Sequence, residues 1–437
     1  MSAPTFARAR AQIEGVNWLE VSGRVTQVVG LVIESFGPNA RVGDLCEVES
    51  GEGEAIWCEV VGFRGDRALL MPLGELEGVR AGCLVRSTGS CLRVPVGDAL
   101  LGRALDGLGR PMDGLGPLGT RATYPILATP PNAMRRKLIS RPLTTGVRAI
   151  DGMLTIGEGQ RMGIFSGSGV GKSTLLGMIA RNCEADVNVI ALVGERGREV
   201  REFIENDLGT QGLRRSVIVC ATSEQPALVR IKAAMTATAI AESFRDQGKS
   251  VLLMMDSVTR FAMAQREVGL AIGEPPSTKG YTPSVFAMLP RLMERAGTSD
   301  RGAITGLYTV LVEGDDTNEP IADASRSILD GHIVLSRALT SRGHYPPIDV
   351  LESLSRVMPM VSSPEQIEHA RTLRELIAAR NDVEDLVSIG AYKSGANKLA
   401  DRAIESWETV CGFLRQDKAE GSDRETTLTR LAELTDA

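Results

Sequence analysis

One glycine-rich run carries the residue types and spacing of a phosphate-binding loop. It reads Ser-Gly-Ser-Gly-Val-Gly-Lys-Ser over residues 166–173, between an apolar segment and a segment of helical composition. Glycines let backbone N–H groups curl around phosphate oxygens, the lysine adds a positive charge, and the serine hydroxyl can ligate Mg²⁺. Only Ser166 departs from the usual pattern, since a glycine is usual there. The predicted phosphate-binding residues are Gly167, Ser168, Gly169, Val170, Gly171, Lys172, Ser173 and Thr174.

A phosphate loop of this kind needs a carboxylate that holds the water shell of the magnesium ion. An apolar segment ending in an acid is its usual source, and residues 251–255 are apolar and precede Asp256. We predict Ser173 and Asp256 as magnesium ligands, with Lys172 acting in catalysis as well as binding. The other interpretation of Asp256 is an acid at the end of a strand that caps the next segment.

Hydrolysis also needs a base that orients the attacking water. Residues 194–199 read Gly-Glu-Arg-Gly-Arg-Glu and follow an apolar run, so Glu195 should lie at the same edge of a sheet as the phosphate loop. We predict Glu195 as the base, Glu199 as a support for the magnesium-bound waters, and Arg196 as a residue that holds Glu195 or a phosphate. A solvated charged loop remains the alternative for Arg198 and Glu199.

Length and composition limit the class of protein. The 437 residues allow about three domains of ~150 residues each, and 43% hydrophobic with 24% charged residues is typical of a globular chain. The net charge of −6 gives no overall positive field for a nucleic acid. Seven scattered cysteines without a C-x-x-C pair indicate reduced thiols. No signal peptide or long apolar run is present, so we expect a cytoplasmic protein, at most peripheral to a membrane.

The pattern along the chain predicts the elements that position these residues. Residues 20–95 alternate apolar and polar side chains between turn residues, which favours a small β-barrel. Residues 96–360 alternate apolar strands with helical segments, as in a doubly wound α/β domain that binds its ligand at the carboxyl ends of the strands. Residues 361–437 are helical in pattern, with Ser363 and Ser422 as predicted N-caps, and Gln366 and Glu425 at the capping-box positions. Residues 1–19 form either a docking segment or a frayed terminus.

Longer motifs resemble a known superfamily. Four of them, at residues 275–281, 313–316, 330–332 and 346–356, resemble the catalytic subunits of rotary ATPases. Within that superfamily, the type III protein-export ATPases of flagella and injectisomes are the group that this chain most resembles. The sequences that carry this resemblance are those of residues 194–200, 252–267, 279–297 and 327–337. The resemblance spans nearly the whole chain.

The resemblance implies roles for residues that spacing alone does not assign. Arg356 falls where the family has an arginine finger that reaches the neighbouring subunit's site, and Tyr345 falls where a tyrosine stacks on adenine. Arg260 is assigned, less specifically, to the flank of the nucleotide or subunit interface. An ion-paired surface arginine and a half-buried tyrosine are the alternatives for the first two. The implied ligands are ATP and Mg²⁺, and ATP is favoured over GTP because no complete N-K-x-D motif is present.

The resemblance also implies partners and a biological role. These are a homohexameric ring, a regulatory dimer at the N-terminus, a coiled-coil stalk protein, a membrane export gate and chaperone–substrate complexes, with no nucleic acid. We expect an ATPase for type III export, in flagellum assembly or alternatively in an injectisome, at the inner face of the cytoplasmic membrane. Two other hypotheses are a catalytic subunit of a rotary ATP synthase and a ring-shaped RNA translocase. The first requires a non-catalytic partner subunit, and the second a basic, aromatic-lined N-terminal domain.

Overall fold

The computed structural model describes residues 21–51, 55–312 and 319–436. These fall into two compact units, which are described separately: one reaches to Leu92 and includes Leu270–Glu274, and the other comprises Arg93–Gly269 and the chain from Pro275. The proposed docking segment at residues 1–19 and the motif at residues 313–316 lie outside the described residues. None of the helices in the described ranges is long and apolar enough to cross a membrane.

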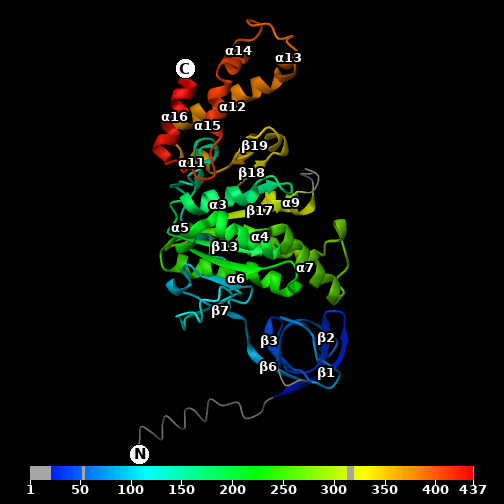
Figure 1. Cartoon of the computed structure of the whole chain (residues 1–437). Coiled ribbons are helices and arrows are strands. Elements are labelled where there is room, and N and C mark those ends of the chain that lie inside the picture. The colour runs from blue at the N-terminus through cyan, green and yellow to red at the C-terminus, as the bar shows by residue number, and fades with distance from the viewer. Residues whose placement is uncertain (1–20, 52–54, 313–318, 437) are drawn as a thin grey trace, which may run out of the picture. The chain divides into compact units, whose positions relative to one another are not determined.

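The first unit is the predicted β-barrel. Six antiparallel strands close on themselves in the order β1-β2-β5-β4-β3-β6, seen as the ring in Figure 1. Their inward side chains, such as Val25, Ile33, Val60 and Leu70, are fully or almost fully buried. The start of β1 alternates between buried and exposed residues as expected, whereas β2 and β5 are buried over consecutive residues. The strands are β1 Ser22–Val29, β2 Val32–Phe36, β3 Asp44–Glu49, β4 Ala55–Arg64, β5 Arg67–Pro72 and β6 Leu84–Cys91.

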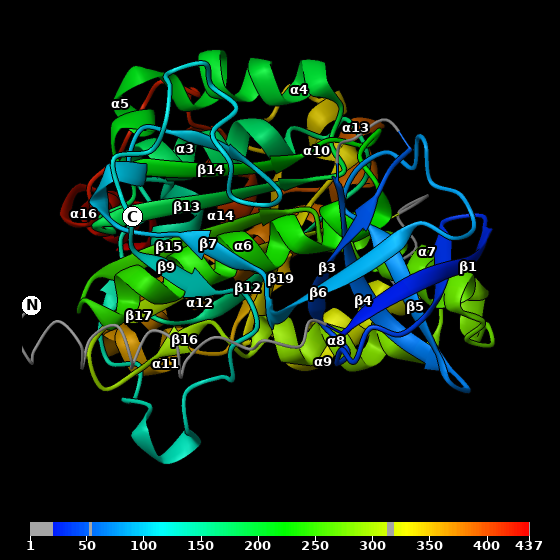
Figure 2. The same cartoon turned by 90° about the horizontal axis from the view of Figure 1, so that it is seen from below.

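The second unit is built on a nine-stranded sheet in the order β19-β18-β12-β17-β15-β13-β14-β8, with β16 beside β17. Figure 2 shows β14, β13, β15 and β17 side by side. The long pairs are parallel, whereas β16 and the edge strand β19 are antiparallel to their neighbours. The strands are β8 Ala104–Asp106, β12 Arg161–Ser166, β13 Val187–Val193, β14 Ser216–Ala221, β15 Ser250–Asp256, β16 Gly297–Thr298, β17 Ala303–Leu311, β18 Gly331–Leu335 and β19 Ile348–Ser355.

Helices cover the two faces of this sheet, which explains why its central strands are apolar along their whole length. In Figure 1, α3 lies on one face and the long α6 on the other. The helices up to the sheet's last strand are α2 Arg148–Met153, α3 Lys172–Asn182, α4 Gly197–Glu202, α5 Gly209–Arg214, α6 Ala227–Asp246, α7 Val258–Ile272, α8 Pro283–Met293, α9 Pro320–Ile328 and α10 Arg337–Ser341. Two small sheets, β7 Arg93–Pro95 with β9 Thr123–Pro125 and β10 Pro142–Leu143 with β11 Ile156–Gly157, complete the fold.

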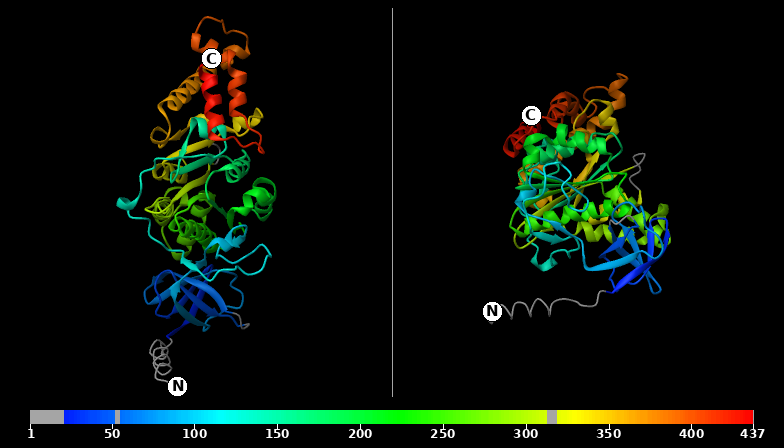
Figure 3. Two further views of the ribbon diagram at one scale, coloured as in Figure 1. Left: turned by 90° about the vertical axis from the view of Figure 1, so that its left-hand side faces the viewer. Right: turned by 60° about the horizontal axis from the view of Figure 1, so that its bottom comes forward.

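The chain after the sheet is helical, as predicted. The helices are α11 Met358–Val361, α12 Pro364–Asp382, α13 Glu384–Ser388, α14 Lys398–Glu405, α15 Trp407–Leu414 and α16 Arg424–Asp436. In Figure 3 the orange and red helices α12, α14 and α16 pack side by side. Ala370, Leu373, Leu376 and Ile377 of α12 are buried, so this helix packs through one apolar face.

The predicted helix caps are only partly correct. Ser363 does cap α12, because its hydroxyl accepts a hydrogen bond from the backbone N–H of Gln366. The side-chain oxygen of Gln366, however, accepts a hydrogen bond from the guanidinium of Arg424 at 2.7 Å instead of the N–H of Ser363 that a capping box requires. Ser422 does not cap α16: the carboxylate of Asp423 accepts the N–H of Thr426 instead. That prediction was wrong by one residue.

Candidate active site

The phosphate loop connects the end of β12 to the start of α3. Gly169 has φ 76° and Gly171 has φ 102°, so both adopt the left-handed conformation that side chains disfavour. An added Cβ at Gly169 would meet nothing within 4 Å, which leaves open space in front of the loop. Val170 is buried between the two glycines and anchors the loop in the core. The first N–H groups of an α-helix have no partner within the helix, so those at the start of α3 can bind an anion, as at other phosphate sites.

Three predicted residues meet at the carboxyl edge of the sheet. Lys172 Nζ contacts Asp256 Oδ1, and it lies 3.6 Å from Glu195 Oε1. Asp256 ends β15, and Glu195 follows β13 after Gly194. These side chains are 12%, 5% and 15% exposed for Lys172, Asp256 and Glu195, so the charges interact with little screening by water. The strand order, not the spacing along the chain, brings the lysine and the two carboxylates together.

Gly194 is a glycine because the chain passes close to α7 at this point. It has φ 72°, and an added Cβ would lie 2.9 Å from the Cβ of Arg260. A glycine at this position lets the chain pass α7 and continue from the end of β13 to Glu195. The backbone N–H of Gly194 donates to the carbonyl oxygen of Ala221, the last residue of β14. This bond holds the turn after β13 against the end of β14.

The electrostatics of Glu195 suit a base. Burial raises its pKa to about 7; the positive charge of Lys172 opposes this effect, and the negative charge of Asp256 adds to it. Burial lowers the pKa of Lys172, but the charges of Asp256 and Glu195 outweigh burial, so the net shift is upward. A base whose pKa lies near neutral pH can accept a proton or orient a water under working conditions.

The residues present also fit a magnesium ion. Asp256 supplies a buried carboxylate and Ser173 a hydroxyl next to Lys172, and both are the hard oxygen ligands that Mg²⁺ prefers alongside phosphates. Glu195 Oε1 is buried and, among the described residues, has no hydrogen-bond partner, which leaves an acceptor for a metal-bound or attacking water.

Sequence reasoning missed Thr309. Its hydroxyl donates to Asp256 Oδ1 at 2.8 Å from the neighbouring strand β17, and the pair is buried. This bond helps to orient the carboxylate. The same strand also contains Thr305, so a threonine in β17 gave no specific signal in the sequence.

The loop after Glu195 is less enclosed than the predicted roles of Arg196 and Glu199 suggest. The Arg196 side chain is 82% exposed and lies 3.7 Å from Glu199. Glu199 is 47% exposed, and its interaction with Glu195 helps to raise the pKa of the base. Arg198 pairs with Glu202 along α4. Glu199 thus lies near Glu195, and Arg196 lies against Glu199; the roles of both residues in catalysis stay predictions.

Tyr345 lies beside the phosphate loop. With Gly171 and Thr174 it lines a cavity of about 240 Å³, and its side chain is 48% exposed. The far wall of this cavity comes from the C-terminal segment, where Gln416 and Lys418 lie. A half-exposed ring beside the start of α3 is where the base of a nucleotide bound at the loop can stack.

Arg356 lies at the opposite edge of the sheet. It follows β19, whose last residue Ser355 pairs with Gly331 at the start of β18, and its own N–H donates to the carbonyl oxygen of Asp330. Because β12 runs parallel to β18 and ends at the phosphate loop, a six-residue strand, roughly 20 Å long, separates Arg356 from its own loop. Arg356 is exposed there.

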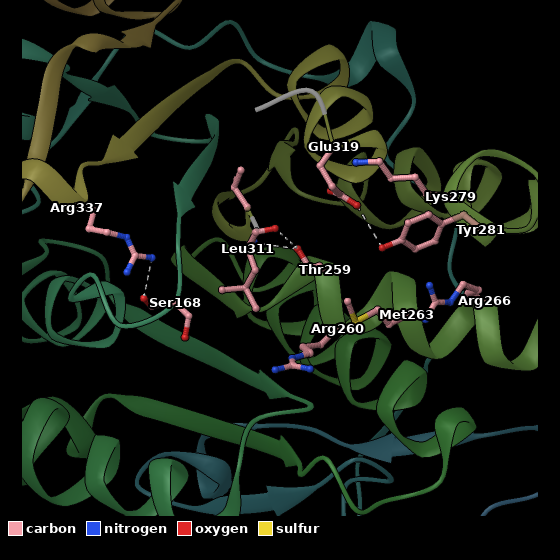
Figure 4. A pocket seen from close by; sticks show the side chains of 11 residues that line it. Ser168, Thr259, Arg260, Met263, Arg266, Lys279, Tyr281, Leu311, Glu319 and Arg337 are labelled. Carbon is pink, nitrogen blue, oxygen red and sulfur yellow. Dashed lines mark hydrogen bonds between the residues drawn. The ribbon is translucent and has the colours of Figure 1, made fainter. Parts of the chain in front are cut away.

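A larger cavity of about 570 Å³ opens beside the tip of the loop at Ser168 (Figure 4). Arg260, Arg266, Lys279 and Arg337 give it a positive lining. The guanidinium of Arg337 donates to the Ser168 carbonyl oxygen at 3.4 Å, the bond drawn at the left of Figure 4. The prediction that Arg260 flanks the nucleotide site agrees with this location, and Arg337 was not foreseen.

The fold and the site define a P-loop nucleotide hydrolase of the rotary-ATPase type. Three family models match in chain order: the ATP synthase alpha/beta family β-barrel domain at residues 25–89, its nucleotide-binding domain at residues 146–355, and the T3SS EscN ATPase C-terminal domain at residues 362–433.

Known proteins resemble the chain over almost its whole length. The "Flagellum-specific ATP synthase" of Bacillus subtilis is 55% identical over 94% of this chain and 95% of its own length. The "Type 3 secretion system ATPase" of Xanthomonas euvesicatoria is 53% identical over 95% and 94%. Among solved structures, the assembled ATPase EscN of enteropathogenic E. coli matches with a TM-score of 0.90 and 47% identity, covering 94% of this chain and 100% of EscN. The chain belongs to the family of flagellum-specific and type III secretion system ATPases, and it is an export-type ATPase. The family and fold predicted from its motifs are confirmed.

Proposed function

We propose that this chain hydrolyses Mg²⁺-ATP in a ring of six identical subunits, and that hydrolysis supports type III protein export at the inner face of the cytoplasmic membrane. The observation that carries the proposal is the separation of the two halves of the site. Lys172, Glu195 and Asp256 lie at one edge of the sheet, whereas Arg356 lies at the other. A site completed by the Arg356 of a neighbouring copy needs a closed, head-to-tail ring.

Each residue has a defined task in this proposal. The N–H groups of the loop and Lys172 bind the phosphates, and Glu195 orients the water that attacks the terminal phosphorus. Mg²⁺, when bound through Ser173 and Asp256, neutralises phosphate charge. Arg356 of the neighbour stabilises the negative charge that develops on the transferred phosphoryl group. Tyr345 supports the adenine, Glu199 supports the magnesium-bound waters, and Arg196 contacts Glu195 or a phosphate in the assembled ring.

The proposed partners are a central coiled-coil stalk, a regulatory dimer at residues 1–19, the membrane export gate and chaperone–substrate complexes that meet the C-terminal helices. The stalk is supported by the solved complex of EscN with its central stalk EscO, which matches this chain with a TM-score of 0.88 and 46% identity. We further propose four domains, at residues 1–19, 20–95, 96–360 and 361–437.

We propose the flagellar system as the setting, and an injectisome is the alternative. Flagellar and secretion relatives are nearly equally similar, at 55% and 53% identity. Production of this chain in bacteria that lack either their flagellar or their injectisome ATPase separates the two. Restored swimming without restored secretion of virulence proteins supports the flagellar setting, and the reverse result supports the injectisome.

The first test of the enzyme is steady-state ATPase activity of the purified chain over a wide range of protein concentrations. Specific activity should rise steeply as copies assemble, because assembly supplies Arg356 to each site. Sedimentation in the same buffer should show the ring appearing over the same range. Binding of ATP without turnover at every concentration would contradict the homohexamer and point to a missing catalytic partner, as in a rotary synthase.

A further inference from the structure

The short connector between α15 and α16 forms one wall of the cavity at Tyr345. Its second residue, Gln416, is only 4% exposed, although the neighbouring residues of the connector are exposed. Burying an amide costs free energy unless its hydrogen bonds are made. The partners of Gln416 therefore show what the connector is built to hold.

Gln416 bonds to three separate parts of the molecule. Its backbone N–H donates to the carbonyl oxygen of Tyr345 at 2.9 Å. Its side-chain oxygen accepts the N–H of Arg148 at 2.9 Å, and its side-chain nitrogen donates to the carbonyl oxygens of Gly146 at 2.7 Å and Glu420 at 2.9 Å. One residue thus joins the tyrosine of the cavity to the segment that leads into the phosphate-loop strand.

Neighbouring bonds hold the connector in the same place. The buried guanidinium of Arg148 donates to the carbonyl oxygen of Phe413 at 2.9 Å and pairs with Glu420. The N–H of Ser422 donates to the Gly146 carbonyl oxygen at 3.2 Å. These bonds hold the connector at both ends. Among the bonds described here, only the one from Gln416 reaches the backbone of Tyr345.

We infer that Gln416 is a positioning residue for the base half of the nucleotide site. It holds Tyr345 and the connector wall at a fixed distance from the phosphate loop, so that a base bound there is enclosed on both sides. The inference rests on the proposed function, specifically on Tyr345 as the support of the adenine. It predicts that loss of the Gln416 side chain weakens the grip on the base and leaves the grip on the phosphates intact.

The test compares two ligands that share phosphates but not a base. Gln416→Leu keeps the size of the side chain and removes its three hydrogen bonds. The Kd of Mg²⁺-ATP, measured by calorimetry, should rise by about tenfold, whereas the Kd of Mg²⁺-tripolyphosphate should stay within about twofold. In turnover, KM for ATP should rise while kcat at saturation changes little, because an interaction equal in ground and transition states has been lost. Gln416→Glu keeps the acceptor for the Arg148 N–H but places a carboxylate oxygen against the carbonyl oxygens of Gly146 and Glu420, so it should raise the Kd of Mg²⁺-ATP in the same direction and by at least as much.

The controls separate this inference from the wider proposal. Gln247→Leu makes the same chemical change at the exposed end of α6, away from the phosphate-loop edge, and should alter neither Kd. Equal weakening of ATP and tripolyphosphate in both Gln416 variants, or no weakening of either ligand, would overturn the role of Gln416. Tyr345→Ala tests the base site itself: unchanged ATP affinity there would overturn the assignment of Tyr345, whatever Gln416 does.

Discussion

At the scale of single residues, the centre of the site is one ammonium group facing two carboxylates. Lys172 contacts Asp256 closely and Glu195 at 3.6 Å, so Asp256 is the better neutralised of the two. Burial raises the pKa of Glu195 to about 7, because the positive charge of the more distant Lys172 offsets only part of the effect of burial. This difference agrees with the different tasks that we propose for the two acids, Asp256 for the metal and Glu195 for the water.

The pH dependence of the enzyme should report Glu195. A base works only when ionised, so kcat/KM should fall as the pH drops through about 7, the raised pKa of this carboxyl. The measurement is kcat/KM from pH 5.5 to 8.5 at constant ionic strength. The direction follows from the upward shift: at pH 6 most Glu195 side chains carry a proton and cannot accept another.

Glu195→Gln is the matched variant for this prediction. It should bind ATP with nearly unchanged affinity and lose turnover by about 10²-fold or more, since a positioned base contributes about that much. An acid limb near pH 5 in the wild type, or substantial turnover of Glu195→Gln, would show that another group is the base.

The residues that sequence alone could assign share one property: each lies within a contiguous motif at the end of an apolar strand. Lys172, Asp256 and Glu195 are of this kind. Thr309 and Gln416 are not, because their partners lie 53 and 268 positions away, at Asp256 and Arg148. Their roles follow from the strand order and from the return of the C-terminal connector to the site, and neither leaves a local signal in the chain.

At the scale of elements, the periodicity of apolar residues was sufficient to predict where strands and helices occur, but not the residues at which they begin and end. The central strands are apolar throughout because both faces of the sheet are covered. Ser422 and Asp423 are both good N-cap residues, so local preference could not separate them. The Ser422 hydroxyl instead pairs with the Thr427 hydroxyl at 2.9 Å, and Asp423 takes the cap.

The N-cap of α12 gives a testable contribution to stability. Ser363→Ala removes the acceptor for the N–H of Gln366 and should lower the free energy of unfolding by about 1 kcal/mol. Ser363→Thr retains a hydroxyl and should stay close to wild type. Denaturant unfolding followed by circular dichroism measures both. Equal stability of the alanine variant and the wild type would mean that solvent caps the helix as well as the serine does.

At the scale of the whole molecule, the proposed mechanism uses residues that one chain contains but cannot bring together. Arg356 lies at the edge of the sheet where the parallel strands begin, and the phosphate loop lies at the edge where they end. Packing of the sheet makes this separation rigid, so no side-chain rotation within one subunit closes it. Arg356→Ala should therefore lower kcat by about 10³-fold or more in the assembled ring, the usual effect of removing such a finger. Arg371→Ala, which removes an exposed arginine paired with Glu368 on α12, should have little effect.

Mixed rings decide whether Arg356 acts between subunits. Glu195→Gln and Arg356→Ala are each expected to be inactive, but a ring that contains both places some intact loops beside intact fingers. With random assembly at equal amounts, about a quarter of the sites should recover if sites act independently. Recovered turnover requires action between subunits, since a finger acting within its own subunit can never complement. If sites are strongly coupled, recovery will be small, but an equal mixture of wild type and Arg356→Ala will then fall far below half of wild-type activity. Absence of recovery together with half activity in that second mixture would exclude a finger that acts on the neighbouring site.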